Sequence, residues 1–377
     1  MTDASNSSIP VVTAEQARWF RFCRSGLATR FVTPEAVASA LFGVQAQILP
    51  AAALALWNRA ADLDEARFNE LLYTERTLVK LWGQRGTLHL YASADWPLLH
   101  AARSINRTWW ERQVGEEGQD EHEAIIERVA SLLRERETLG RSDLRAAQLE
   151  LSDDHFSAWG GIFADLVRRG YACHAGRAGN EGRFAHRERW LPALDWRPPD
   201  ADAANIEVMR RYFAAYGPAT LHDFAYWRAV GVAQSRPWRQ ALAGDLAEVT
   251  VDGRPMLILR SDLPHLLAQP PARGDWPVRM LYRFDPYLLA HREKEWVVDP
   301  ADYNRVWRPA GHIEGVVLVQ GRAAATWRYD RTGKGLLITV SPFKQLPRYV
   351  ASAIRKTAPR IANFFGLPLV DISEQVD

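Results

Sequence analysis

A recurring order of predicted elements, with helices before a two-stranded hairpin, constrains the fold of this chain more than any other feature. Apolar residues at helical spacing predict a first helix over 12–25. Thr33 and Pro34 then form a helix start, with threonine as N-cap and proline at the first helical position, and Pro50 opens a third helix. Two strand-like runs around a glycine-rich turn predict a hairpin over 78–91.

The same order recurs twice. A proline pair at 198–199 marks a linker between the second and third rounds. Helices followed by a two-stranded wing are typical of winged-helix folds, so three rounds predict an α+β protein of three tandem winged-helix units, although the rounds share no clear sequence identity. The later predicted helices cover 121–136, 142–145, 156–169, 203–216, 221–228 and 235–242, and the later hairpins cover 171–185 and 246–259.

The rest of the chain is strand-rich. Residues 279–340 alternate strand candidates with tight turns at 320–321 and 332–333, and a last helix is predicted over 347–365. The predicted domains are therefore winged helix 1 over 12–115, winged helix 2 over 116–198, winged helix 3 over 199–275 and a β-rich C-terminal region over 276–377.

Several classes of protein are excluded by simple counts. The longest apolar run, 49–57, is shorter than the roughly 20 residues of a membrane-spanning helix. The N-terminus has no basic start followed by an apolar stretch, so we expect no secretory signal and a cytoplasmic protein. Cys23 and Cys173 are too few for a disulfide framework or a four-cysteine zinc site.

Arginine supplies most of the positive charge. The 47 basic and 45 acidic residues give a net charge of +2, and 42 of the basic residues are arginine. Arginine binds phosphate through a bidentate fork and stacks on bases, which favours a nucleic-acid partner. A GC-rich coding bias would produce the same composition.

Four short motifs occur in order along the chain: Gly-Val-Gln-Ala-Gln at 43–47, Gln-Arg-Gly-Thr-Leu-His-Leu at 84–90, Tyr-Gly-Pro-Ala-Thr at 216–220 and Phe-Asp-Pro-Tyr-Leu-Leu at 284–289. Together they resemble the tandem winged-helix DNA glycosylases of the AlkZ/YcaQ type, and the likeness covers about 14–365. It implies three winged helices in a C-shaped arrangement and a bacterial enzyme that excises bulky cationic alkylpurines and unhooks interstrand crosslinks. The AlkZ-like branch is associated with self-resistance to DNA-alkylating antibiotics such as azinomycin.

The resemblance places the catalytic residues at Gln45 and Gln47, and glutamine in third place matches the AlkZ branch. A glutamine amide can hold a water molecule and direct a dipole at developing positive charge. It cannot act as a formal acid or as a charged carboxylate. The motif therefore predicts substrates whose base is already cationic, such as N7-alkylguanine and N3-alkyladenine. The two side chains share a face only on an extended segment. The alternative is that both glutamines cap neighbouring helix ends.

Further residues are candidates for support and for binding. Arg85 is a candidate phosphate contact, and His89 is a candidate hydrogen-bond partner of the catalytic segment or a satisfied structural histidine. Asp285 is a candidate acid or base, or a turn residue. Basic residues spread over the predicted repeats are candidates for DNA binding, with a solvated surface as the alternative: Arg18, Arg21, Arg59, Arg183 and Arg187.

We predict no metal and no cofactor, because histidines and cysteines are not clustered at ligand spacing and no phosphate-binding loop motif occurs. Lys80 is the only lysine near the motifs, so we expect a monofunctional, monomeric enzyme acting on double-stranded DNA, without a Schiff-base lyase step. Two other functions remain open, a winged-helix regulator without chemistry and a protein that sequesters an alkylating drug in an aromatic pocket.

Overall fold

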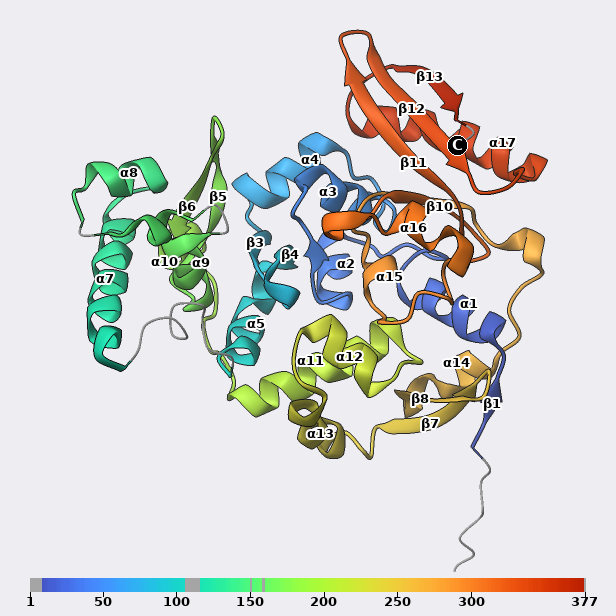
Figure 1. The fold of residues 1–377 in the computed structure, drawn as a ribbon, viewed down its shortest axis with the longest axis horizontal. Coiled ribbons are helices and arrows are strands. Elements are labelled where there is room, and N and C mark those ends of the chain that lie inside the picture. The colour runs from blue at the N-terminus through green and yellow to red at the C-terminus, as the bar shows by residue number, and fades with distance from the viewer. Residues whose placement is uncertain (1–8, 106–115, 150, 158–159, 376–377) are drawn as a thin grey trace, which may run out of the picture. The chain divides into compact units, whose positions relative to one another are not determined.

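The computed structural model describes residues 9–105, 116–149, 151–157 and 160–375 (Figure 1). It is a mixed α+β structure with two compact units. The first unit comprises 1–65 and 209–377, and the second unit comprises 66–208. The end of the first predicted domain, 106–115, lies outside the described residues. The predicted divisions after 115, 198 and 275 stay predictions, because this coarser division does not test them.

The N-terminal helices begin within about two residues of the predicted positions. Helix α1 (Ala14–Arg24) starts at Thr13, whose hydroxyl accepts from the backbone N–H three positions on in a reciprocal capping box. Helix α2 (Pro34–Ala40) is capped by the Thr33 side chain. Helix α3 (Leu49–Trp57) begins one residue before the predicted proline.

Helix α1 packs through two apolar faces. Ala17 and Phe20 lie in a cluster with residues of the hairpin formed by β7 (Leu246–Val251) and β8 (Arg254–Leu259). Phe22 lies in a second cluster with residues of the C-terminal sheet and the segments before it. The helix is therefore at the centre of the first unit's core.

The predicted third round of helices and hairpin is confirmed as secondary structure. Helices α12 (Leu221–Arg228) and α13 (Val232–Ala241) precede the β7–β8 hairpin, whose turn at 252–253 has two residues with positive φ. The short strand β1 (Val11–Val12) adds to this hairpin in parallel with β7. Helix α11 (Ala201–Tyr216) comes before them in the chain.

The C-terminal region is strand-rich, as predicted. Its five-stranded sheet has the order β13-β12-β11-β10-β9 (Figure 1). Helix α17 (Arg348–Phe364) packs against β12 and β13. The strands are β9 (Arg279–Leu281), β10 (Gly315–Val319), β11 (Arg322–Thr332), β12 (Gly335–Pro342) and β13 (Leu369–Glu374).

In the second unit, the two predicted hairpins form one continuous sheet. Strands β3 (Leu78–Trp82) and β4 (Leu88–Ala92) form the first hairpin, and β5 (Ala172–Ala178) and β6 (Glu181–His186) form the second. Lys80 of β3 pairs with the β5 backbone, which joins the hairpins in the order β4-β3-β5-β6. The sequence does not predict this joining, because it depends on a pairing between residues 94 positions apart.

The remaining elements are short or lie around these sheets. No helix in the described part of the chain is both long and apolar enough to cross a membrane. The other elements are β2 (Val44–Gln45), α4 (Glu65–Asn69), η1 (Glu70–Thr74), η2 (Gln84–Gly86), η3 (Ser93–Asp95), α5 (Trp96–Arg103), α7 (Glu116–Glu135), α8 (Arg141–Ala146), η4 (Asp153–Phe156), α9 (Gly161–Arg168), α10 (Arg187–Trp190), η5 (Arg260–Asp262), α14 (Leu263–Leu267), η6 (Arg273–Asp275), α15 (Pro286–Leu289), η7 (Pro300–Asp302), α16 (Tyr303–Val306) and η8 (Pro309–Gly311).

Candidate active site

Gln45 and Gln47 lie on a non-helical segment between α2 and α3. The chain leaves α2 through Phe42 and Gly43, which both have positive φ, at 47° and 103°. The glycine makes this exit possible at little cost, because it has no Cβ to strain in such a conformation. Gln45 then ends strand β2 and Gln47 lies in a bend before α3. The predicted non-helical stretch is confirmed.

The two glutamines differ in exposure. The Gln45 residue is only 7% exposed, whereas Gln47 is exposed to solvent. Helix α2 ends at a cap on Leu41, and α3 begins at a cap on Ile48 that makes no side-chain hydrogen bond. Neither glutamine is itself the cap residue of α2 or α3, and the alternative in which their side chains cap the neighbouring helix ends stays open. That both amides face one groove stays a prediction.

A tyrosine of the third motif forms a hydrogen bond to the chain just before this segment. The Tyr216 hydroxyl donates to the Leu41 carbonyl at 2.9 Å, four residues before Gln45. The Tyr216 carbonyl in turn accepts from His291 Nε2 at 2.9 Å. Both Tyr216 and His291 are buried, so these bonds are shielded from competing water. The sequence places the motif but assigns no role to its tyrosine.

A buried ion pair anchors the far end of α3. Arg59 forms a bidentate pair with Asp285 at 2.6 and 2.8 Å, and both side chains are fully buried. Arg59 also donates to the Ser25 carbonyl at 2.7 Å, and Asp285 Oδ1 accepts from the Tyr287 backbone N–H at 2.9 Å as the N-cap of α15. Asp285 is thus the turn residue of the two alternatives. Arg59 is fully buried and therefore cannot contact DNA in this structure, contrary to the prediction.

The arginines of α1 also make structural contacts. Arg21 is only 4% exposed; its Nη2 donates to the Pro218 carbonyl, and its guanidinium lies 4.7 Å from the centre of the Trp296 ring. Arg18 is half-buried and donates from Nε to the Gln320 carbonyl at 3.1 Å. Arg21 is therefore too buried to contact DNA, contrary to the prediction. Arg18 is partly exposed and stays a candidate for a DNA contact.

In the second unit, Arg85 lies in the tight loop of the β3–β4 hairpin, and His89 follows it on β4. The Gly83 backbone N–H donates to the Thr87 carbonyl at 2.8 Å, and Arg85 has a positive φ of 55°. His89 is 3% exposed, and its Nδ1 lies 2.9 Å from the same Thr87 carbonyl oxygen. Because a carbonyl only accepts, Nδ1 carries the proton.

Burial, helped by the nearby Arg85 charge, lowers the pKa of His89 to about 3. His89 is therefore neutral near pH 7 and cannot supply a charged acid. Its contacts within the hairpin support the structural interpretation. Gln45 and Gln47 belong to the first unit and His89 to the second, so a hydrogen bond from His89 to the predicted catalytic segment stays a prediction.

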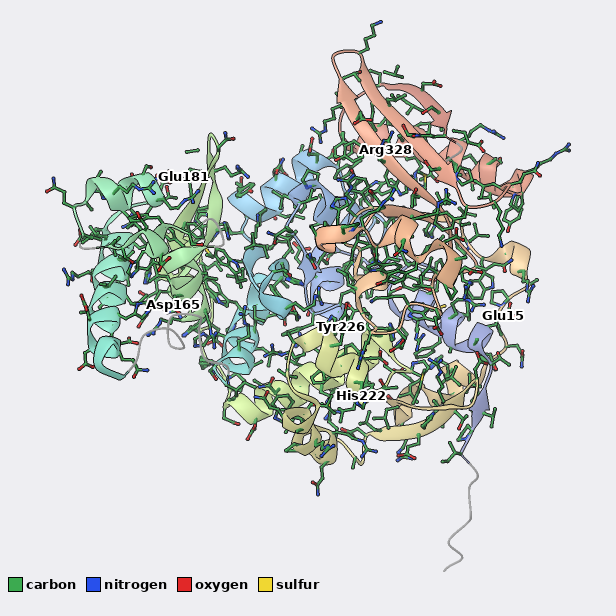
Figure 2. The ribbon with its side chains drawn as sticks, in the orientation of Figure 1. Glu15, Asp165, Glu181, His222, Tyr226 and Arg328 are labelled. Atoms are coloured by element: carbon green, nitrogen blue, oxygen red, sulfur yellow. The ribbon has the colours of Figure 1, made fainter. Side chains whose placement is uncertain are left out.

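The arginines in and directly after the second hairpin differ in their surroundings. Arg183 and Arg187 contact other side chains of the protein, whereas Arg177 is exposed near the turn. Arg183 contacts Asp143 at 2.5 Å and lies 3.9 Å from Glu181 (Figure 2), and Arg187 stacks on Trp196 at 3.8 Å. Arg177, near the hairpin turn, is exposed and donates to the Asn180 carbonyl at 2.9 Å. Exposure therefore favours Arg177 over Arg183 and Arg187 as a phosphate contact.

Lys80 lies on β3 beside this hairpin. Burial and the Arg177 charge lower the pKa of Lys80 to about 8, and no carboxylate within the described part of the chain forms an ion pair with it. The described residues also hold no group of three or more His, Cys, Asp or Glu that could bind a metal ion.

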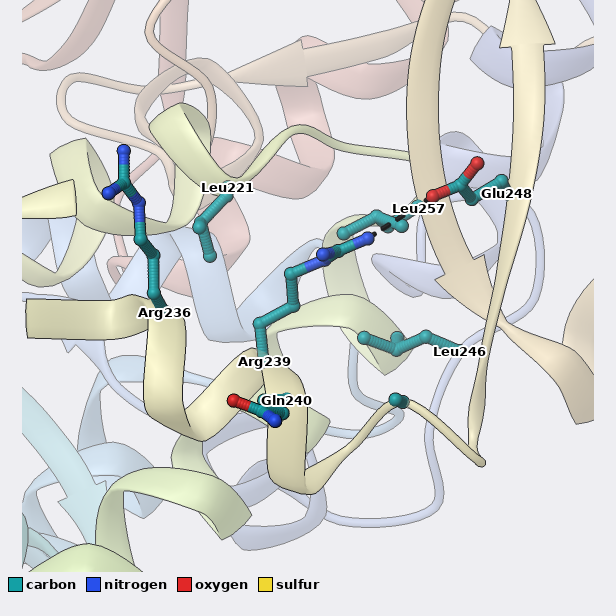
Figure 3. A pocket seen from close by; sticks show the side chains of 8 residues that line it. Leu221, Arg236, Arg239, Gln240, Leu246, Glu248 and Leu257 are labelled. Carbon is teal, nitrogen blue, oxygen red and sulfur yellow. Dashed lines mark hydrogen bonds and ion pairs between the residues drawn. The ribbon is translucent and has the colours of Figure 1, made fainter. Parts of the chain in front are cut away.

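A half-open cavity of about 630 Å³ lies between α12, α13 and the β7–β8 hairpin (Figure 3). Arg239 and Glu248 form an ion pair across it at 3.2 Å. Its lining includes no aromatic residue, so it does not provide the aromatic pocket that drug sequestration would require. The lining residues are Leu221, Arg236, Arg239, Gln240, Ala243, Leu246, Glu248 and Leu257.

Comparisons with known proteins cover nearly the whole chain. The model of the family described as "DNA glycosylase AlkZ-like" matches residues 38–364. The "Interstrand DNA cross-link repair glycosylase" of Streptomyces sahachiroi is 30% identical over 93% of this chain and 98% of its own length. The solved structure of Streptomyces sahachiroi DNA glycosylase AlkZ superimposes with a TM-score of 0.81 and 28% identity, covering 97% of this chain and 100% of that chain.

Proposed function

The chain belongs to the family of AlkZ-like DNA glycosylases, and from that premise we propose that it hydrolyses the N-glycosidic bond of bulky cationic N7- and N3-alkylpurines in double-stranded DNA. We also propose that it unhooks interstrand crosslinks, the activity in the name of its Streptomyces relative, and so protects a producer of a DNA-alkylating natural product. It would act as a monofunctional monomer on the bacterial nucleoid in the cytoplasm.

One observation carries this proposal. Gln45 and Gln47 lie on a non-helical segment between two helices, and no motif residue there is a carboxylate. Bond cleavage then depends on a leaving group that already carries positive charge and departs as a neutral base. The glutamines need only hold the water and stabilise the positive charge that develops on the sugar, through amide dipoles fixed in place before the reaction.

The contacts around the segment support this role. The Tyr216–Leu41 hydrogen bond fixes the chain before Gln45, and the Arg59–Asp285 pair fixes the end of the helix after Gln47. Water-directing groups must be held within a fraction of an ångström, so such supports from outside the motif are expected of a catalytic segment. We propose Arg18, Arg177, Arg183 and Arg187 as the remaining candidates for DNA contacts.

The test is the formation of abasic sites in a duplex that carries an N7-alkylguanine. We expect release by the native chain and a loss of at least about 100-fold in the double variant Gln45→Ala/Gln47→Ala, the scale of removing oriented transition-state donors. Gln234→Ala is the matched control, because Gln234 is an exposed glutamine of α13. A crosslinked duplex, followed by strand separation on a denaturing gel, tests unhooking.

No release by the native chain would contradict the glycosylase proposal and favour a DNA-binding regulator. Release that is undiminished in the double variant would contradict only the assignment of the two glutamines.

A further inference from the structure

One stretch of the chain has a strong positive charge. Residues 331–370 contain seven basic residues and no aspartate or glutamate, whereas the other 337 residues contain 40 basic and 45 acidic residues. Most of this stretch after the β11–β12 hairpin is helix α17, which packs beside β12 and β13 of the C-terminal sheet (Figure 1). Four of the seven basic residues lie on this helix: Arg348, Arg355, Lys356 and Arg360.

Helix α17 has an apolar face and a basic face. Val350, Ile354 and Ile361 recur at helical spacing and are buried. The four basic residues occupy the other side of the helix, and all four are exposed to solvent. Because the apolar face is already covered, the face available to a partner is the basic one.

The basic residues of this face have no carboxylate partner. In the part of the chain that the structure describes, none of the four forms an ion pair. Asp371 and Glu374 on the neighbouring strand β13 form no ion pair with them either. By contrast, the exposed Arg254 of the same unit lies 3.6 Å from Glu295. The charges of α17 are therefore left to solvent, salt ions or a bound anion.

Two further arginines crowd the C-terminal end of α17. Burial and the Arg360 charge lower the pKa of the half-buried Arg30, although Asp62 opposes this effect. Burial, together with the charges of Arg30 and Arg360, lowers the pKa of Arg279 to about 10. Like charges held close to one another repel, and a bound anion relieves that repulsion. The crowding thus favours an anionic partner at this end of the helix.

The phosphate backbone of a nucleic acid fits this surface better than other anions do. Arginine binds phosphate oxygens through its planar fork, and arginines make up all but one of the six residues described. The charges from Arg348 to Arg360 extend over about 18 Å of helix, more than one small anion can span. Anionic membranes engage the apolar face of an amphipathic helix as well, but that face of α17 is buried.

Contacts within the first unit place the basic face near the proposed catalytic segment. The Arg360 guanidinium lies 5.5 Å from the centre of the Trp57 ring, and Phe364 packs edge-on against the same ring at 6.3 Å. Trp57 is the last residue of α3, which begins two residues after Gln47. A helix of nine residues is about 14 Å long and a turn of duplex DNA about 34 Å, so this end of the face lies within one duplex turn of Gln47.

We propose that the exposed basic face of α17, with Arg30 and Arg279 at its C-terminal end, binds the phosphate backbone of duplex DNA beside the lesion. This inference rests on the proposed function, which makes duplex DNA the substrate. The contacts hold the duplex without reading its sequence, because they reach phosphates and not base edges.

The test is the salt dependence of binding to an undamaged duplex of about two turns, measured by fluorescence anisotropy. We expect Arg355→Gln/Lys356→Gln to reduce the slope of log affinity against log salt concentration by about 2, because each phosphate contact contributes about 0.9. Glutamine is a good helix former, so the exposed helix should be retained. Arg254→Gln/Arg292→Gln is the matched control, because it removes two exposed arginines of the same unit that each lie beside a glutamate, and its slope should stay unchanged.

A charge-preserving variant separates charge from helix structure. Arg355→Lys/Lys356→Arg keeps both cations, and we expect its slope to match that of the native chain. An unchanged slope in the glutamine variant would overturn the inference, as would equal reductions in the glutamine variant and the control. Tighter binding of the native chain to phosphatidylglycerol vesicles than to the duplex, lost in the glutamine variant, would overturn it too and assign the face to a membrane.

The surface and the proposed function can fail separately. Abasic-site formation in a duplex with an N7-alkylguanine is a second readout, for which we expect the glutamine variant to raise KM and to leave the single-turnover rate at saturating enzyme unchanged. A native chain that binds duplex DNA through α17 but forms no abasic sites would contradict only the proposed function. Abasic sites formed by a chain whose salt slope does not depend on Arg355 and Lys356 would contradict only the surface.

Discussion

At the scale of single residues, the proposed catalytic pair, Gln45 and Gln47, has no ionisable group, so we expect the substrate to supply the charge. Gly43 and Pro50 bracket Gln45 and Gln47, and this local signal sufficed to predict a non-helical segment from the sequence. The burial of Arg59 could not be predicted, because its partner, Asp285, lies 226 residues further along the chain. Whether a charged residue is buried or exposed depends on such distant partners.

Gln47→Asp tests how much the missing carboxylate matters. A carboxylate at this exposed position can deprotonate the attacking water and stabilise an oxocarbenium-like sugar, which an amide does only as a dipole. We therefore expect faster release of N7-alkylguanine, or release of less activated bases. Single-turnover rates on duplexes with each lesion measure this effect. Unchanged kinetics on both duplexes would contradict the charge argument.

His89 gives a prediction for pH dependence. Its pKa is about 3 in the folded chain and near 6.5 when unfolded, so the unfolded chain binds more protons between these values. Stability from this group is therefore complete above pH 6.5 and falls with decreasing pH, by at most about 1.4 kcal/mol per pH unit.

We expect His89→Gln to unfold in urea with a shallower loss of stability between pH 6.5 and 4 than the native chain shows. The difference between the two chains isolates His89 from the other buried histidines. Identical slopes would mean that His89 is protonated in the folded chain.

At the scale of elements, long-range contacts rather than local propensity orient the proposed catalytic segment. The cap at Thr33 was predicted from the sequence because its partner lies three residues away, whereas the cap at Thr13 fell inside the predicted first helix. The positions of α3 and α15 relative to each other depend on the Arg59–Asp285 pair. The joining of the second unit's hairpins depends on the Lys80–His174 pairing. Neither has a local signature.

Asp285→Asn tests the anchoring pair. Asparagine keeps the N-cap acceptor of α15 but leaves the Arg59 cation buried without a countercharge. Breaking a buried ion pair on one side costs about 3–5 kcal/mol, and urea unfolding should show a loss of that size. Asp245→Asn removes an exposed carboxylate from its pair with Arg210 and should cost less than about 1 kcal/mol. Equal effects of the two substitutions would show that the anchor is not important for stability.

At the scale of the whole molecule, the net charge of +2 does not indicate which arginines are exposed and which are paired within the protein. The sequence predicted that arginine would serve DNA binding, but Arg21 and Arg59 are buried and Arg183 and Arg187 contact the protein itself. Composition counts charges without their partners, so it could not separate these roles. Arg177 is exposed near a hairpin turn, where its guanidinium group can contact a phosphate.

Salt dependence of DNA binding distinguishes a phosphate contact from a charge that acts at a distance. Each phosphate contact releases counterions and contributes about 0.9 to the slope of log affinity against log salt concentration. We expect Arg177→Ala to reduce this slope by about 1 and to weaken binding equally for undamaged duplexes of different sequence. Arg197→Ala removes the same charge from the same unit, but Arg197 is an exposed partner of Asp195, so the slope should stay unchanged. Equal changes in the two variants would mean that Arg177 acts through net charge alone, and the hairpin tip would then lose its place among the proposed DNA contacts.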